Sequence, residues 1–227
     1  MALPEIVSVA DVFAFAQITA ENAGQTTLMT YIKGAVERLV RNYMGISITQ
    51  GTYTHFLPMT GYDYPSEVLY TKEYPLRTVT SIREDINGRF GQPSGSFPAT
   101  SALVAGDEFY IDYKTAGFSK FGLIRRINRL WPSNAGTVKI VYVAGWTAAE
   151  LAGDVTDPEL DARDIGLVVK QKSTVMFQNS LNVAERNGIS SESLEGYSVS
   201  FVADNKNVLS LDDDMKAILQ GFKRIRT

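Results

Sequence analysis

The stretch LMTYIKGAVERLVRNYMG, residues 28–45, has the pattern of an amphipathic helix. Its apolar residues recur at intervals of three, four or one, which places them on a single stripe: Leu28, Ile32, Ala35, Val36, Leu39 and Tyr43. The other face is predicted to carry Lys33, Glu37 and Arg41, of which Glu37 and Arg41 form an i,i+4 pair. Gly45 is placed to end the helix, because glycine accepts a left-handed backbone.

Outward from this helix, the pattern changes on both sides. Upstream, Ser8 and Asp11 have the spacing of a capping box, which predicts a short first helix. Downstream, the apolar period changes from helix to strand, with candidate strands at 46–49, 53–56, 68–70, 79–82, 109–113 and 138–144. Asn87-Gly88 is a hairpin turn signal, and residues 91–101 read as an exposed loop. We therefore expect a small antiparallel sandwich or barrel from about residue 46 to residue 145.

A second long helix is expected after Asp157-Pro158, because proline suits a first helical turn and acidic residues favour its positive end. One face carries Ala162, Ile165, Val169, Met176 and Val183, with Lys172, Ser173 and Ser180 among them. This mixed stripe predicts contact with another subunit or a wet groove. Gly188 ends the helix, Tyr197 to Val202 alternates as a strand, and Leu211 to Ile225 predicts a short helix with a basic tip.

The composition excludes several classes of site. The 227 residues include no cysteine and a single histidine, so disulfides, thiolate metal sites and multi-histidine metal sites are excluded. The net charge of -3 gives no general attraction to nucleic acid or to an anionic membrane. No run of apolar residues is long enough for a membrane span, and the first residues lack the pattern of a signal peptide. We expect a protein made and kept in the cytoplasm until it is assembled, with no cofactor.

Candidate chemical groups each have a structural interpretation that we prefer. Asp212-Asp213-Asp214 suits a divalent cation, but it also suits the acidic start of a helix, as does the acidic run 157–164. His55 is placed on a strand without an orienting partner, which favours a structural role over that of a general base. Trp131 and Trp146 have the character of packing anchors rather than ligand platforms. We predict no catalytic residues and no metal ligands.

Two basic clusters leave open whether they contact phosphate. The first is Arg125, Arg126 and Arg129, and the second is Lys216, Lys223, Arg224 and Arg226. Phosphate contact would release counterions from DNA. Because neither cluster is interleaved with stacking aromatics, a solvated face or an acidic protein partner is the preferred interpretation.

The order of several short motifs resembles that of the head–tail connector proteins (adaptor or head-completion proteins) of long-tailed bacteriophages. A helix ending in Asn42-Tyr43-Met44-Gly45 runs into Ile48-Thr49-Gln50. Tyr74-Pro75-Leu76-Arg77-Thr78-Val79-Thr80-Ser81-Ile82 follows, then Trp131-Pro132 and Val141-Tyr142-Val143-Ala144-Gly145-Trp146, and then a long helix. The resemblance covers residues 26–186, and the tail around residues 195–201 and 218–225 is similar to the end of longer members. The large β region and the glycine-rich loop depart from the shortest members.

The resemblance implies an α+β fold in which the N-terminal and central long helices pack together, with an inserted β region and an extended C-terminal arm. The expected parts are a helical connector core (1–45 and 155–187), an antiparallel β region (46–150) and a docking arm (188–227). It also implies a structural virion protein at the neck, made in the host cytoplasm, that forms a ring, commonly of twelve subunits. The implied partners are the portal protein, a tail terminator or a neck (stopper) protein, and DNA in transient, non-specific passage.

The implied contact residues fall into two groups. Portal docking is expected of the C-terminal arm, through Tyr197, Val199, Phe201, Leu219, Phe222, Lys223, Arg224 and Arg226. The ring interface is expected on the second long helix, through Ile165, Val169, Lys172 and Met176. Alternatives are another tail structural subunit such as a tail terminator, which the strong helix at 28–43 disfavours, or a small carbohydrate- or ligand-binding β module. The module would need a concave site of convergent carboxylates and aromatics, which the sequence does not mark.

Overall fold

The computed structural model describes residues 5–19, 23–57, 65–85, 97–112, 118–185, 191–194, 197–200 and 210–223. The helices are α1 (Val9–Ala16), α2 (Ala23–Met44), α3 (Ala148–Ala152), α4 (Arg163–Glu185) and α5 (Asp213–Gln220), with a 3-10 turn at Ala99–Ser101. The strands are β1 (Gly51–Leu57), β2 (Val68–Tyr70), β3 (Leu76–Glu84), β4 (Phe109–Ile111), β5 (Leu123–Arg126), β6 (Val138–Ala144), β7 (Ser191–Leu194) and β8 (Tyr197–Ser200). The α+β class expected from the sequence is confirmed.

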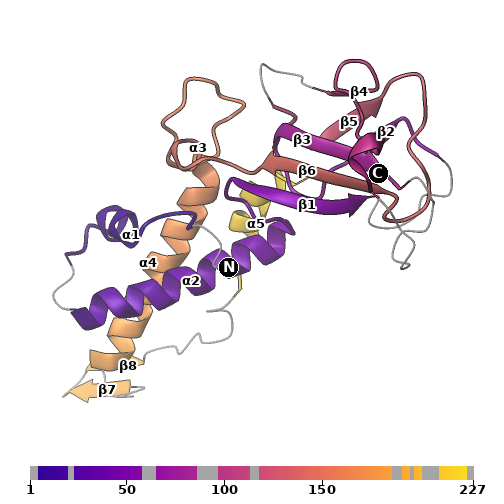
Figure 1. Cartoon of the computed structure of the whole chain (residues 1–227). Helices are drawn as coiled ribbons and strands as arrows, with labels where there is room; N and C mark the ends of the chain where they lie inside the picture. The colour runs from indigo at the N-terminus through magenta and orange to yellow at the C-terminus, as the bar shows by residue number, and fades with distance from the viewer. Residues whose placement is uncertain are drawn as a thin grey trace.

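The helices gather at one end of the molecule and the two larger sheets at the other (Figure 1). α2 and α4 cross and pack on each other, and α1 and α5 pack against this pair. The core of this helical unit includes Val36, Val40, Ile165, Val169 and Phe177. Phe13 of α1 meets Phe177 edge-on, with the ring centroids 5.6 Å apart. Packing of the two long helices therefore holds the helical end together.

The β end is a sandwich of two open antiparallel sheets. One has the strand order β1-β6-β3 and the other β2-β5-β4. The central strand β6 alternates between fully buried and half-buried residues, as a strand with one covered face should. Side chains from both sheets share one core, which contains Leu57, Leu69, Ile82, Phe109, Ile124, Trp131 and Ile140. The described strands do not close into a barrel.

Local sequence signals explain the helix ends. Ser8 Oγ accepts a hydrogen bond from the Asp11 backbone N–H at 3.0 Å, and the Asp11 carboxylate accepts one from the Ser8 N–H at 3.1 Å. The predicted capping box is thus confirmed. Gly45 ends α2 with a φ of +72°, also as predicted. A second capping box, Thr147 with Glu150, starts the short helix α3, which the sequence analysis did not predict.

Several element boundaries differ from those expected. The second long helix begins at Arg163, not at Pro158, because residues 158–160 form a turn. Residues 46–49 are not a strand, although Thr49 makes an isolated bridge to Trp146. β5 was missed, because its sequence Leu-Ile-Arg-Arg was read only as a basic cluster. The turn signal Asn87-Gly88 and most of the loop at 91–101 lie outside the described residues.

Which face of α2 is buried also differs from the prediction. The fully buried apolar residues are Met29, Ile32, Val36, Val40 and Met44, so the stripe is rotated from the predicted one. Lys33 and Glu37 were expected on the exposed face but are only 2% and 4% exposed. They are buried because the segment before α1 folds over this side of α2. The Glu37–Arg41 ion pair itself is present, at 3.4 Å.

Candidate functional site

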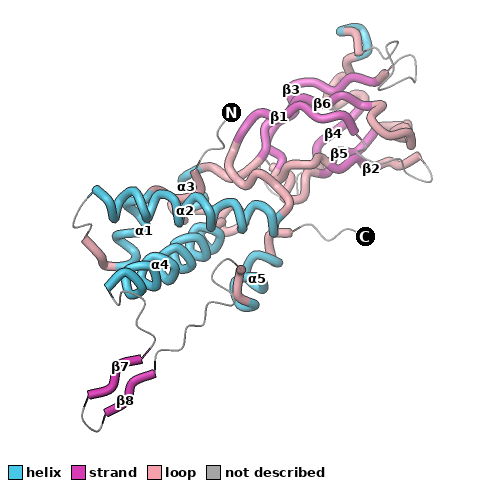
Figure 2. Tube along the Cα trace, turned by 90° about the horizontal axis from the view of Figure 1, so that it is seen from below, coloured by secondary structure: helices cyan, strands magenta, loops and turns pink. Residues whose placement is uncertain are grey.

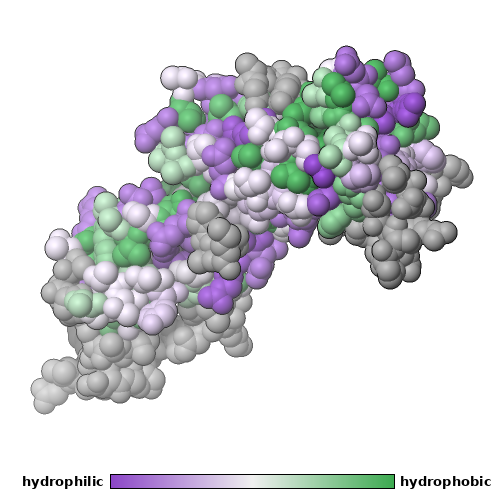
Figure 3. Space-filling view, in the orientation of Figure 1, coloured by the Kyte–Doolittle hydropathy of each residue, from purple (hydrophilic) through white to green (hydrophobic). Residues whose placement is uncertain are grey.

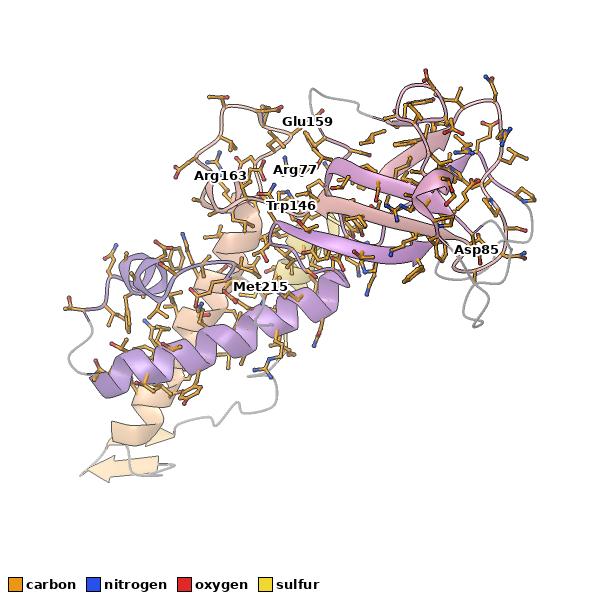
Figure 4. All side chains as sticks on the ribbon, viewed as in Figure 1. Arg77, Asp85, Trp146, Glu159, Arg163 and Met215 are labelled. Atoms are coloured by element: carbon orange, nitrogen blue, oxygen red, sulfur yellow. The ribbon has the colours of Figure 1, made fainter. Side chains whose placement is uncertain are left out.

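The C-terminal helix, expected to dock on a portal, packs on the helical unit of its own chain. Leu219 is fully buried there, together with Leu211 and Met215. The Phe222 ring meets the Trp146 ring edge-on at 5.9 Å between centroids. Figure 4 shows Trp146 where the β end meets the helices, near Met215 of α5. Leu219 and Phe222 therefore contribute to the protomer's own core in this structure.

Polar contacts reinforce the position of α5. The Tyr43 hydroxyl donates a hydrogen bond to the Lys216 carbonyl at 3.2 Å, and the Lys223 ammonium lies 4.4 Å from the centroid of the Tyr43 ring. Lys172 of α4 forms an ion pair with Asp212 at 3.4 Å. Asp213 and Asp214 lie in the first turn of α5, where the helix dipole favours acidic residues. The acidic triplet thus occupies a helix start, the structural interpretation that we preferred.

Other predicted docking residues belong to a small hairpin or lie outside the described residues. Tyr197 and Val199 are part of β8, which pairs antiparallel with β7. Figure 2 shows this hairpin apart from the helical unit and from both sheets of the sandwich. An isolated two-stranded hairpin is marginally stable in water. Phe201, Arg224 and Arg226 lie outside the described residues.

The four residues predicted to form the ring interface are buried inside the protomer. Ile165 and Val169 are fully buried, and Met176 is 7% exposed. Lys172 is 4% exposed, and its charge is compensated by Asp212. The mixed stripe of α4 faces α2 and α5 of the same chain. A neighbouring subunit cannot reach these side chains in this conformation.

The basic cluster at 125–129 is largely engaged within the sandwich. Arg126 forms ion pairs with Glu84 and Glu108, at 3.4 and 3.9 Å, and lies over the Trp131 ring. Arg125 pairs with Asp112 at 3.1 Å, and this contact raises the pKa of Arg125. Trp131 and Trp146 are both buried, as expected of packing anchors. Arg125 and Arg126 therefore have acidic partners within their own chain, whereas Arg129 is exposed.

His55 lies on β1 beside Tyr142 of β6. Its Nδ1 is 2.8 Å from the Tyr142 hydroxyl, which also accepts a hydrogen bond from the Glu73 backbone N–H at 3.0 Å. Burial lowers the pKa of His55 below its ordinary value of 6.5, with a smaller contribution from Lys72. Burial also raises the pKa of the Tyr142 phenol. The hydrogen bond between His55 and Tyr142 links the neighbouring strands β1 and β6, which fits the structural role preferred for His55.

No group of three or more His, Cys, Asp or Glu side chains in the described ranges is arranged to hold a metal ion. Among the helices described, none has both the length and the apolar character needed to cross a bilayer.

The two long helices carry exposed apolar side chains that the sequence pattern did not predict. Tyr31 of α2 is 74% exposed, and Leu167 and Val175 of α4 are 40% and 44% exposed. Each lies on the side of its helix opposite the buried stripe. Periodicity alone did not separate the two faces, because both helices carry apolar residues all round.

No protein-family model matches the chain, and no curated protein does. Among solved structures, the chain is similar to a chain from the neck of an empty GTA particle with C6 symmetry. The TM-score is 0.50 and the sequence identity is 12%, and the match covers 100% of this chain and 94% of that chain. A chain from the virion of a native gene transfer agent (GTA) particle gives a TM-score of 0.43 at 15% identity, and the match covers 100% of this chain and 94% of that chain. A chain from the neck of a native GTA particle with C12 symmetry gives a TM-score of 0.41 at 13% identity, and the match covers 100% of this chain and 97% of that chain. At an identity of 12%, the first of these is a likeness of fold, and it extends over the whole chain.

Proposed function

We propose that this protein is a non-enzymatic structural subunit of the neck of a phage-like particle, a head–tail adaptor that forms a ring between the portal and the tail. The observation that carries the proposal is the fold likeness to a GTA neck chain, which spans 100% of this chain and 94% of the other. The order of motifs from the helix at 28–45 to the strand at 138–144 supports the same conclusion independently.

The proposed ring continues the DNA channel, most simply with twelve subunits, and meets a tail terminator or stopper protein on its far side. A net charge of -3 suits this role, because a strongly basic lumen would bind passing DNA and retard its exit. The site of action is the neck of the particle, after synthesis in the host cytoplasm.

The β7–β8 hairpin is the proposed portal-docking element. Among the described strands, β7 and β8 pair only with each other, so each has one edge on which a further strand can be added. A partner that adds a strand also stabilises the hairpin. Tyr197 and Val199 of β8 are proposed to contribute to this contact. Leu219, Phe222 and Lys223 contribute only if α5 leaves its place on the helical unit.

Mass photometry and negative-stain imaging of the protein, alone and mixed with its cognate portal ring, test the proposal. We expect closed rings, or a portal with one added layer. A chain in which residues 191–200 are replaced by a Gly/Ser linker should keep its fold and lose the added layer, whereas Val104→Glu, on the β end, should keep both. A wild-type chain that stays monomeric with the cognate portal would refute the adaptor function.

A further inference from the structure

The outer face of α2 is partly exposed and has little steric obstruction: its larger side chains are exposed and its two small residues are half-buried. It consists of Tyr31, Gly34, Ala35, Arg38 and Asn42, which lie on one side of the helix, opposite its buried stripe. Tyr31 is 74% exposed, and a Cβ added at Gly34 would meet nothing within 4 Å. A pale area, the colour of intermediate hydropathy, lies over the N-terminal half of α2 in Figure 3. Small residues beside a free tyrosine leave room for the side chains of another helix.

The outer face of α4 has a matching character. It consists of Asp164, Leu167, Gln171, Val175 and Gln178, which recur at intervals of three or four and are all exposed. Leu167 and Val175 are large enough to insert beside a helix at a position occupied by glycine and alanine. The face lacks lysine and arginine, whereas the outer face of α2 lacks aspartate and glutamate.

The charges on the two faces are opposite in sign. Arg38 of α2 and Asp164 of α4 are both exposed. Arg163, the neighbour of Asp164, pairs mainly with Asp161, which raises the pKa of Arg163, and Asp164 adds to this rise. Asp154 and Glu159, also exposed, lie in the segment leading into α4 and add to the negative charge near Asp164. Figure 4 shows Glu159 on the loop above the start of α4. Surfaces of opposite charge attract each other and disfavour the pairing of a face with itself.

The two outer faces point to opposite sides of the helical unit. The buried stripes of α2 and α4 pack towards each other, so the exposed stripes point away from each other. In Figure 2, α2 and α4 lie alongside each other within the helical unit. A ring needs two different patches on each subunit, since a single self-complementary patch gives only a dimer.

We infer that the outer face of α2 in one copy of this chain binds the outer face of α4 in the next copy, and that this contact closes the ring. The inference rests on the proposed function, which supplies the ring. Within it, the two helices run antiparallel: Arg38 pairs with Asp164, Leu167 packs beside Gly34 and Ala35, and Val175 lies about two turns further along, beyond Tyr31. This contact replaces the interface expected at the buried residues Ile165, Val169, Lys172 and Met176.

Blocking each face separately tests the inference. Tyr31→Glu with Ala35→Glu blocks the face on α2, and Leu167→Glu with Val175→Glu blocks the face on α4. Each double variant alone should fail to form rings, with or without portal. Mixed in equal amounts, they should form a species of two subunits and nothing larger, because one intact α2 face and one intact α4 face remain. Val104→Glu is the matched control, since Val104 is 52% exposed on the β end and lies on neither face.

Reversing the two charges tests the pairing of Arg38 with Asp164 without changing the apolar contacts. Arg38→Glu and Asp164→Arg should each raise the concentration needed for half assembly by about tenfold, and the chain with both changes should recover most of the loss. Circular dichroism of each variant checks that the helices remain folded.

The outcomes separate the inference from the function. If the wild type forms rings and either blocked variant does too, the interface inferred here is wrong and the adaptor function stands. If blocking the α2 face prevents assembly but blocking the α4 face does not, α2 pairs with itself, and this result would also overturn the inference. A wild-type chain that forms no ring, even on its cognate portal, would overturn both.

Discussion

Glu37 is a carboxylate buried in the helical unit, and its hydrogen bonds join the N-terminal segment to α2. One carboxylate oxygen accepts the backbone N–H groups of Ile6 and Val7, at 2.8 and 3.3 Å. The same oxygen is 3.4 Å from the Lys33 ammonium, which also donates to the Val7 carbonyl at 3.1 Å. A buried charge is tolerated when its partners are complete. Without Glu37, the Ile6 and Val7 N–H groups would lose their acceptor, whereas Lys33 would keep its contacts with Glu5 and the Val7 carbonyl.

Glu37→Ala should therefore destabilise the protein strongly, by about 3–5 kcal/mol, because two backbone N–H groups would be left buried without their acceptor, and Lys33 and Arg41 would each lose one charged partner. Glu5→Ala is the matched control. Glu5 also pairs with Lys33, but its side chain is 62% exposed, so its loss should cost under about 1 kcal/mol. Urea unfolding followed by circular dichroism measures both. Equal effects of the two substitutions would contradict this account.

His55 should titrate below its ordinary pKa of 6.5, because burial disfavours its charged form. The folded state then binds a proton less readily than the unfolded chain. The contribution of His55 to stability is therefore complete above pH 6.5 and is lost as the pH falls below this value towards the folded-state pKa. Since the chain has one histidine, its ring protons give a single NMR titration curve. The same resonance in denaturant is the control, and a folded midpoint at or above 6.5 would refute the prediction.

At the scale of the elements, α5 shows how a short helix is held by its neighbours. Helices of this length are not stable alone in water, so packing must supply most of the stability. Leu219 enters the core beneath α5, whereas its neighbour Ile218 is 37% exposed. The two residues have similar size and opposite surroundings, so they form a matched pair.

Leu219→Ala should lower the free energy of unfolding by about 2–5 kcal/mol, because a fully buried leucine leaves a cavity. Ile218→Ala should cost much less. Denaturant unfolding of the free protein measures the difference. If instead Leu219→Ala leaves stability unchanged and only weakens portal binding, then α5 is a docking element in solution, as the sequence analysis expected.

At the scale of the whole molecule, two short segments cross where the helices meet the β end. The Trp146 N–H donates to the Ile48 carbonyl at 2.8 Å, and the Gln50 N–H donates to the Trp146 carbonyl at 2.8 Å. Gly145 lies in this crossing with a φ of +99°. A Cβ built there would lie 2.5 Å from the Thr49 carbonyl oxygen, a backbone atom that cannot easily move.

Gly145→Ala should destabilise the protein by more than about 1 kcal/mol, from backbone strain and from the clash with Thr49. Gly34→Ala is the contrast, because Gly34 is helical with open space around it. That substitution should raise stability by about 0.5–1 kcal/mol. Thermal unfolding of the two variants beside the wild type measures both signs. A Gly145→Ala protein as stable as the wild type would contradict the close approach.

The order of helices and strands was largely predictable, because local signals act between residues close in sequence. The capping box at Ser8, the helix end at Gly45 and the strand at 138–144 follow from turn chemistry and periodicity alone. The short helix after Thr147 carries the same kind of signal, with Glu150 at the third helical position, and could have been found. The candidate interaction surfaces were not predictable in this way, because exposure depends on what packs against each face.

By itself, the sequence determined the α+β class, the long helices, most strands and the absence of cysteine chemistry. Only the tertiary structure decided which face of each helix is buried. Lys33, Glu37 and Lys172 look like surface residues in sequence, yet their partners Ile6, Val7 and Asp212 come from distant segments that fold over them. Burial is set by contacts between residues far apart along the chain, and helical periodicity does not reveal which polar residues find a buried partner.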